Sequence, residues 1–144
     1  MAIIFHPKPG LILLCDFSQG FKAPEMVKSK RPVIVLTGAI RGRANLVTVV
    51  PLSTVEPTPP QCHHYKIPKP SMPMIKNFQR GDSWVKGDMV YTIGFHRLNA
   101  ILLGKRGSDG KREYFKHRLG GEQMREIYRC ILYGLNLGHL GEHL

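Results

Sequence analysis

The 144-residue chain contains no apolar run that approaches the roughly 20 residues needed to cross a bilayer. Proline interrupts its first residues, MAIIFHPKPG, too early for a secretory signal peptide. Its three cysteines, Cys15, Cys62 and Cys130, are far apart and odd in number. Their spacing argues against a disulfide framework and a closely spaced zinc site. These absences predict a cytoplasmic protein without a membrane-spanning segment.

Acidic residues are also scarce. There are 10 Asp and Glu against 21 Lys and Arg, so the net charge is +11. Such a positive field attracts phosphate-rich partners and speeds their encounter. A basic surface that only keeps the protein soluble is the alternative, and we favour contact with nucleic acid. The length and the 42% hydrophobic content fit one domain spanning residues 1–144.

Three segments rich in apolar and β-branched residues predict strands over residues 11–17, 32–36 and 46–52. The first is nearly all apolar, so we expect both of its faces to be covered. The turn 39–45, between the second and third segments, predicts an antiparallel hairpin.

Weaker strand signals follow in the second half of the chain. Residues 62–68 and 83–95 are strand candidates, the latter with a bend at Gly87-Asp88. The charged segment 105–118 predicts a loop that turns at Asp109-Gly110 and leads into a short exposed strand.

One helix is predicted near the C-terminus, because apolar residues recur there at helical spacing and Gly138 follows as a terminator. The apolar face consists of Met124, Ile127, Tyr128, Ile131, Leu132 and Leu135. Short strands, tight turns and a final amphipathic helix predict a mainly β (α+β) fold, with the helix packed on a small, strongly bent sheet or barrel.

The most informative stretch is a basic loop, residues 18–30, that runs directly into the second predicted strand at Arg31. Lysines of the loop are expected to contact phosphates, and an aromatic ring there can stack on a base. The residues concerned are Phe21, Lys22, Lys28 and Lys30. We expect this loop to be mobile and to become ordered on RNA.

Other cations can extend the phosphate track, although solvated turns are the commoner use of such residues. They are Arg41, Arg43, Lys76 and Arg80. Asp88 and Arg97 are weaker candidates for contacts to bases or to a dimer partner. Trp84, Tyr91 and Phe95 are expected to pack in the core.

The order of several short motifs resembles a known family. The motifs are a strand ending in DF, a loop with PEM and lysines, then KRPVIVL, VTVVPLST, WVKGDMVYTI and FHRL. Over roughly residues 7–135 this order is similar to the PemK/MazF toxins of bacterial type II toxin–antitoxin systems.

The resemblance implies an SH3-like barrel of the PemK/CcdB type with a C-terminal helix, usually as a homodimer that an antitoxin neutralises. It implies metal-independent, sequence-selective cleavage of single-stranded RNA, with no cofactor. The family's catalytic arginine matches Arg31, and its catalytic hydroxyl matches Ser53, with Thr54 adjacent. The chain departs where Leu11 follows Gly10, because family members often carry aspartate there. Its loops are also long, so no RNA sequence preference is carried over.

The chemistry of the matched residues fits RNA cleavage. The RNA 2′-hydroxyl attacks the adjacent phosphorus, and a guanidinium at Arg31 can stabilise the extra negative charge. Ser53 can donate a hydrogen bond to the phosphoryl group. The alternatives are a structural ion pair of Arg31 with Asp16 or Glu25, and a strand-end hydroxyl that only satisfies backbone groups.

The general base stays open, with four histidines as candidates. They are His63, His64, His96 and His117. Cys62-His63-His64 also invites a metal interpretation, which we disfavour because adjacent strand residues point to opposite faces.

Two other functions compete with the ribonuclease. One is a non-catalytic gyrase poison like CcdB, and the other is a basic small barrel that binds nucleic acid without chemistry. The combination of KRPV and VVPLST favours the ribonuclease.

Overall fold

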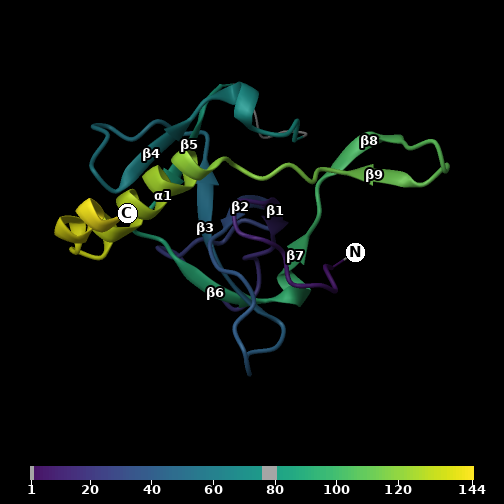
Figure 1. The fold of residues 1–144 in the computed structure, drawn as a ribbon, viewed down its shortest axis with the longest axis horizontal. Coiled ribbons are helices and arrows are strands. Elements are labelled where there is room, and N and C mark those ends of the chain that lie inside the picture. Colours follow the sequence, from purple (N-terminus) through teal and green to yellow (C-terminus); the bar gives the residue numbers. More distant parts are fainter. Residues whose placement is uncertain (1, 76–80) are drawn as a thin grey trace.

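The computed structural model describes residues 2–75 and 81–144. Within them lie nine strands, one α-helix and three short 3₁₀ helices (Figure 1). The strands are β1 (Ile12–Cys15), β2 (Arg31–Val35), β3 (Leu46–Ser53), β4 (His64–Ile67), β5 (Ser83–Lys86), β6 (Tyr91–Gly94), β7 (Leu98–Asn99), β8 (Leu102–Arg106) and β9 (Arg112–Tyr114). Helix α1 spans Gly121–Gly134, and the 3₁₀ helices span Lys69–Ser71, Phe95–Arg97 and Gly138–His143. The predicted mainly β fold with a C-terminal helix is therefore confirmed.

Strand β3 is the centre of the main sheet. Its residues Val49–Pro51 pair antiparallel with β2 along one edge. Along the other edge its first half pairs with β6 and its last two residues pair with β5. The strand order runs β4-β5-β3-β2-β1-β7, so the bent sheet is open rather than closed into a full barrel. The predicted 39–45 turn joins β2 to β3 as expected.

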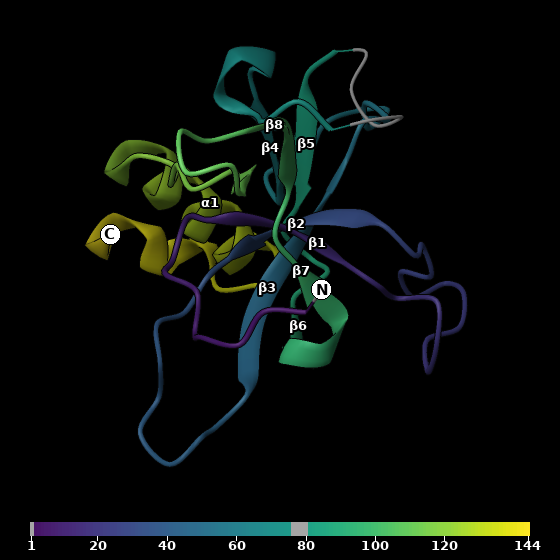
Figure 2. The same ribbon diagram turned by 90° about the vertical axis from the view of Figure 1, so that its right-hand side faces the viewer.

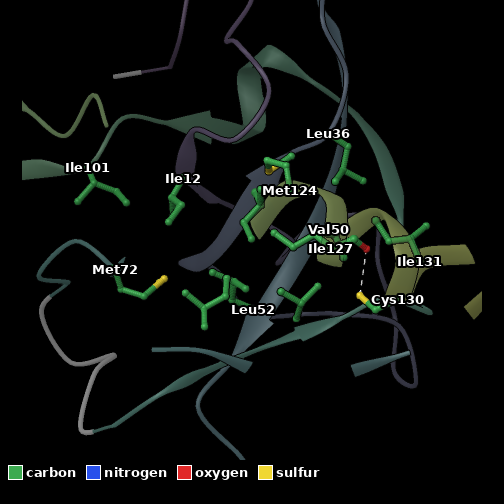
Figure 3. Close-up of a cluster of buried hydrophobic side chains, with 13 residues drawn as sticks. Ile12, Leu36, Val50, Leu52, Met72, Ile101, Met124, Ile127, Cys130 and Ile131 are labelled. Atoms are coloured by element: carbon green, nitrogen blue, oxygen red, sulfur yellow. Dashed lines mark hydrogen bonds between the residues drawn. The ribbon is translucent and has the colours of Figure 1, made fainter. Parts of the chain in front are cut away.

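Both faces of β1 are covered, as the first apolar run predicted, and β2 and β3 are covered on both faces over most of their length. Alternate residues of β1, β2 and β3 enter two separate clusters of buried side chains. One cluster, with Ile12, Ile34 and Leu52, lies beneath helix α1 (Figure 3). The other, with Val33 and Phe17, lies on the opposite face. Helix α1 thus leaves the second face to loops and short strands.

The predicted helix is present, and most of its apolar face is buried. Ile127 is fully buried, and the Tyr128 hydroxyl donates a hydrogen bond to the Leu36 carbonyl at 2.6 Å. Leu135 was predicted on the buried face, but it lies just beyond the helix and is 57% exposed.

The helix ends earlier than Gly138 predicted. Asn136 adopts a left-handed conformation with φ 61°. Its N–H donates to the Tyr133 carbonyl, and the Leu137 N–H donates to the Leu132 carbonyl. These two bonds form a Schellman motif with asparagine in the usual glycine position. Asparagine tolerates this conformation, so the helix needs no glycine to stop.

Replacing Asn136 with glycine is expected to preserve or raise stability, because glycine adopts φ 61° without steric cost. Asn136→Val is expected to lower the free energy of unfolding by about 1–2 kcal/mol. Urea denaturation of both variants checks this, and equal midpoints would contradict the assigned cap.

The segment 83–95 divides into β5 and β6, with Gly87-Asp88 in the intervening turn as predicted. The charged segment 105–118 turns at Asp109-Gly110 and leads into the short strand β9, as predicted. Strand β9 pairs with β8, which precedes the turn, so the two strands form a hairpin. This hairpin projects from the body of the molecule (Figure 1). Among the residues described, no helix is long and apolar enough to cross a membrane.

Candidate functional site

Arg31 is the first residue of β2, directly opposite Cys15 of β1. Its side chain is half-buried, and one guanidinium N–H donates to the Leu52 carbonyl of β3 at 3.1 Å. Burial lowers the pKa of Arg31 below its ordinary value. That ordinary value is so high that the guanidinium remains charged at neutral pH. A fixed cation therefore stands where β2 begins and β3 ends.

Cys15, across from Arg31, is fully buried. Burial raises the pKa of the Cys15 thiol to about 12. A neutral, buried thiol is a poor nucleophile. Cys15 is therefore a poor candidate for a catalytic nucleophile.

Ser53 is the last residue of β3 and is buried, whereas Thr54 is exposed. The Ser53 hydroxyl oxygen accepts a hydrogen bond from the Val55 N–H at 3.1 Å. This is the local backbone contact considered above as the alternative role. A hydroxyl that accepts one bond still has its own proton to donate. Ser53 is thus held in place without losing its donor.

The register of the strands brings Arg31 and Ser53 together. In the β2–β3 pair Val33 lies opposite Pro51. Two residues before Val33 on β2 is Arg31, and two residues after Pro51 on β3 is Ser53, so these two residues are level with each other. Their side chains therefore lie on the same face of the sheet. The hydrogen bond from Arg31 to the Leu52 carbonyl agrees with this placement.

The basic loop 18–30 is attached to the body at several points. Its Met26 N–H donates to the Tyr91 hydroxyl at 3.0 Å. Arg97 donates to the carbonyls of Asp16 and Gln19, at 3.1 and 2.7 Å. The mobility predicted for this loop stays a prediction, and these contacts define where it is held.

Phe21 contributes to that attachment. Its ring lies edge-on to those of Phe17 and Tyr91, and the Arg97 guanidinium lies 4.7 Å from its centroid. This packing gives Phe21 a structural role, while stacking on a base stays a prediction. The predicted phosphate contacts Lys22, Lys28 and Lys30 are all exposed.

Two of the remaining predicted RNA contacts, Arg41 and Arg43, lie away from Arg31. Arg41 and Arg43 are exposed in the turn at the opposite end of the β2–β3 hairpin. In Figure 2 that turn projects at the lower left, and the 18–30 loop projects at the right. Lys76 and Arg80 fall outside the described residues.

His63 and His64 do not point to opposite faces of a strand, as the sequence interpretation assumed. His63 lies in the turn before β4 rather than in the strand, so its ring meets that of His64 at 4.1 Å between centroids. The argument from opposite faces was therefore wrong. Within the part of the chain that the structure describes, His63, His64 and Asp88 are the one candidate metal-binding group, with ligand atoms within 4.8 Å of one another.

The donor set nevertheless fits a metal poorly. His64 Nδ1 accepts a hydrogen bond from the Gln61 N–H at 3.0 Å. In the neutral ring the proton then sits on Nε2, so the free lone pair is already used. Lys86 lies directly opposite His64 and adds a repelling positive charge. Desolvation, then the neighbouring His63 and Lys86, lower the pKa of His64.

Sequence reasoning gave Arg97 and Tyr91 too little weight. Both anchor the basic loop through contacts with residues more than 60 positions away. No local pattern signals such a contact. The sequence offered only one hint of this role: both are polar side chains in or next to a segment that otherwise has the apolar pattern of a strand.

A family model described as "PemK-like, MazF-like toxin of type II toxin-antitoxin system" matches residues 8–133. The chain belongs to this family. A relative in Escherichia coli K12, the putative uncharacterized protein YifN, is 31% identical over 153 aligned residues. That alignment covers 94% of this chain and 96% of YifN.

Solved structures share the PemK-like, MazF-like fold. An endoribonuclease from a mycobacterial species has a TM-score of 0.57 and 18% identity, covering 91% of this chain and 92% of that one. The Mycobacterium tuberculosis toxin MazF-mt6 has a TM-score of 0.55 and 19% identity, with coverages of 90% and 98%. A mycobacterial endoribonuclease in complex with its cognate antitoxin has a TM-score of 0.55 and 17% identity, with coverages of 91% and 96%.

Proposed function

We propose that this protein is the toxin of a type II toxin–antitoxin pair and acts as a metal-independent endoribonuclease on single-stranded RNA. The 2′-hydroxyl of the RNA attacks the adjacent phosphorus and displaces the 5′-oxygen of the next nucleotide. The products carry a 2′,3′-cyclic phosphate and a 5′-hydroxyl. Family membership supports the toxin role, and two of the structurally similar proteins are endoribonucleases.

The observation that carries the proposal is the meeting of Arg31 and Ser53 at one end of β2 and β3. A rigid strand start holds the guanidinium, so it need not reorganise as charge builds on the phosphoryl oxygens. Ser53 donates to the same phosphoryl group and fixes its orientation. Buried Ser53 shares the face of Arg31, which supports it over exposed Thr54 as the catalytic hydroxyl.

The partners follow from the same site. Lys22, Lys28 and Lys30 are exposed in the loop that leads into Arg31, and their positive charges attract the RNA backbone. An antitoxin with acidic segments competes for these cations, and the structural neighbour solved with its cognate antitoxin supports such a partner. A homodimer is proposed by analogy with the family.

Purified protein incubated with long RNA in EDTA is expected to produce fragments with 5′-hydroxyl ends. Such ends accept labelled phosphate from polynucleotide kinase without prior phosphatase treatment. The 3′ ends should carry a cyclic phosphate, which acid converts to a monophosphate. Cleavage that requires added Mg²⁺, or fragments with 5′-phosphates, would contradict the proposed chemistry.

Two other outcomes separate the competing functions. RNA that is bound but stays intact would support a non-catalytic nucleic-acid-binding barrel. Intact RNA together with inhibited DNA supercoiling by gyrase would support a gyrase poison.

A further inference from the structure

The register that brings Arg31 to Ser53 continues across two more strands. Ser53 lies directly opposite Trp84 of β5, and Trp84 lies directly opposite Lys66 of β4. Directly opposed residues of antiparallel strands share a face. Arg31, Ser53, Trp84 and Lys66 therefore form one row across the sheet, which we call the cross-strand row.

The cross-strand row lies on the face turned away from helix α1. The neighbours of Lys66 and Trp84 along their own strands, Ile67 and Val85, enter the cluster beneath the helix. Because side chains alternate along a strand, Lys66 and Trp84 point to the opposite face. With strands about 4.8 Å apart, Lys66 stands about 14 Å from Arg31 along the row.

Lys66 is held in place yet accessible. Its side chain is 54% exposed, and its Nζ lies 6.0 Å from the centroid of the Trp84 ring. An ammonium at that distance is attracted to the face of an indole. Asp82 Oδ2 lies 3.9 Å from Nζ, at the outer limit of an ion pair. The Lys69 N–H fixes Asp82 through a 3.0 Å bond to Oδ1.

Trp84 is well placed to orient Lys66. Only 9% of its surface is exposed, although it belongs to neither buried cluster among the described residues. Trp84 is buried, as expected for a core residue, and its ring also lies within reach of the Lys66 ammonium, so it can serve as a platform for that cation. Lys86, on the same face as Trp84 and Lys66, adds a further positive charge.

We propose that Lys66 binds a backbone phosphate of the RNA strand, beyond the scissile phosphate at Arg31, and that Trp84 positions its ammonium for this contact. This inference rests on the proposed function, since it extends the same site. A phosphodiester oxygen accepts from the ammonium in place of Asp82. RNA would therefore lie along the cross-strand row from Arg31 toward β4.

The test compares wild type, Lys66→Gln and Lys66→Arg in RNA cleavage in EDTA, at several salt concentrations. Lys66→Gln should raise KM roughly tenfold with kcat unchanged, because the contact lies outside the reacting centre. Lys66→Arg should restore most of the affinity. In filter binding of a 2′-deoxy version of this RNA, which lacks the attacking hydroxyl and stays intact, Lys66→Gln should reduce the slope of log K against log salt by about 0.7, the value for one lost phosphate contact.

Lys105→Gln is the matched control, because Lys105 is also an exposed strand lysine paired with a carboxylate, Glu113, at 3.6 Å. It should leave KM and the salt slope unchanged. Equal KM for wild type and Lys66→Gln, with wild type active, would overturn this inference alone. Absence of cleavage by wild type would overturn the proposed function. In that case filter binding still tests the phosphate contact of Lys66. Equal affinities of wild type and Lys66→Gln would show that Lys66 makes no such contact.

Trp84 provides an independent readout, because it is the chain's single tryptophan. Saturation with the uncleavable 2′-deoxy strand should change its fluorescence emission in wild type, and this change should be smaller in Lys66→Gln. Unchanged emission of wild type saturated with this strand would contradict an RNA path along the cross-strand row.

Discussion

Arg31→Ala is expected to lower the rate of RNA cleavage by on the order of 10²- to 10³-fold, the usual effect of removing one preorganised donor to a transition-state oxyanion. The guanidinium is fixed by its hydrogen bond to the Leu52 carbonyl and by the start of β2. Its loss leaves the charge on the phosphoryl oxygens without this stabilisation. Single-turnover cleavage of long RNA, with enzyme in excess, measures the chemical step.

Arg31→Lys distinguishes charge from geometry. Lysine keeps the positive charge but lacks the planar fork that contacts two phosphate oxygens at once. We therefore expect an activity between those of wild type and Arg31→Ala. Binding of RNA should weaken less than the rate of cleavage, because the stabilisation is greatest in the transition state.

Arg125→Ala is the matched control for these variants. Arg125 is an exposed arginine of helix α1, on the far side of the sheet from Arg31. It should cleave RNA at the wild-type rate. Thermal unfolding of all three variants excludes loss of fold as the cause. Wild-type activity in Arg31→Ala would contradict the assignment of Arg31 to catalysis.

The strands and the helix could be predicted from local sequence patterns, because apolar residues occupy the positions whose side chains are buried. The run from Ile12 to Cys15 is apolar at each position, since side chains on both faces of the sheet are covered. The helix could be located because Met124, Ile127 and Ile131 repeat at its period. Arg31 at the strand start was equally visible, although only the family motif connected it with Ser53.

Features that depend on contacts between distant segments could not be predicted. The cross-strand row requires the register of four strands, and a shift of one residue would turn Lys66 to the other face. The His63 ring meets that of His64 because β4 begins at His64, two residues later than the predicted strand 62–68. Tyr91 and Arg97 hold the basic loop in place, but nothing in the sequence around them indicates a contact with that loop.

Gly87 is another feature set by a contact between distant segments. The Gly87-Asp88 pair predicted a bend, but the sequence did not show why glycine is needed there. A Cβ added at Gly87 would lie 2.6 Å from the His63 carbonyl oxygen and 2.7 Å from that of Cys130 in helix α1. A Cβ at Gly134, on the same helix, would lie 2.6 Å from the Gly87 carbonyl oxygen. The helix therefore packs backbone against backbone on the β5–β6 turn.

Gly87→Ala is expected to lower the free energy of unfolding by about 3 kcal/mol, the upper end of the usual cost of overpacking. Both clashing atoms belong to backbone, so relief requires a shift of the helix or of the turn rather than of a side chain. The melting temperature should fall by on the order of 10 °C. Gly38→Ala is the control, since a Cβ there meets nothing within 4 Å and its φ lies outside the left-handed region. If the two variants melt together, helix α1 does not approach the β5–β6 turn as closely as these distances require.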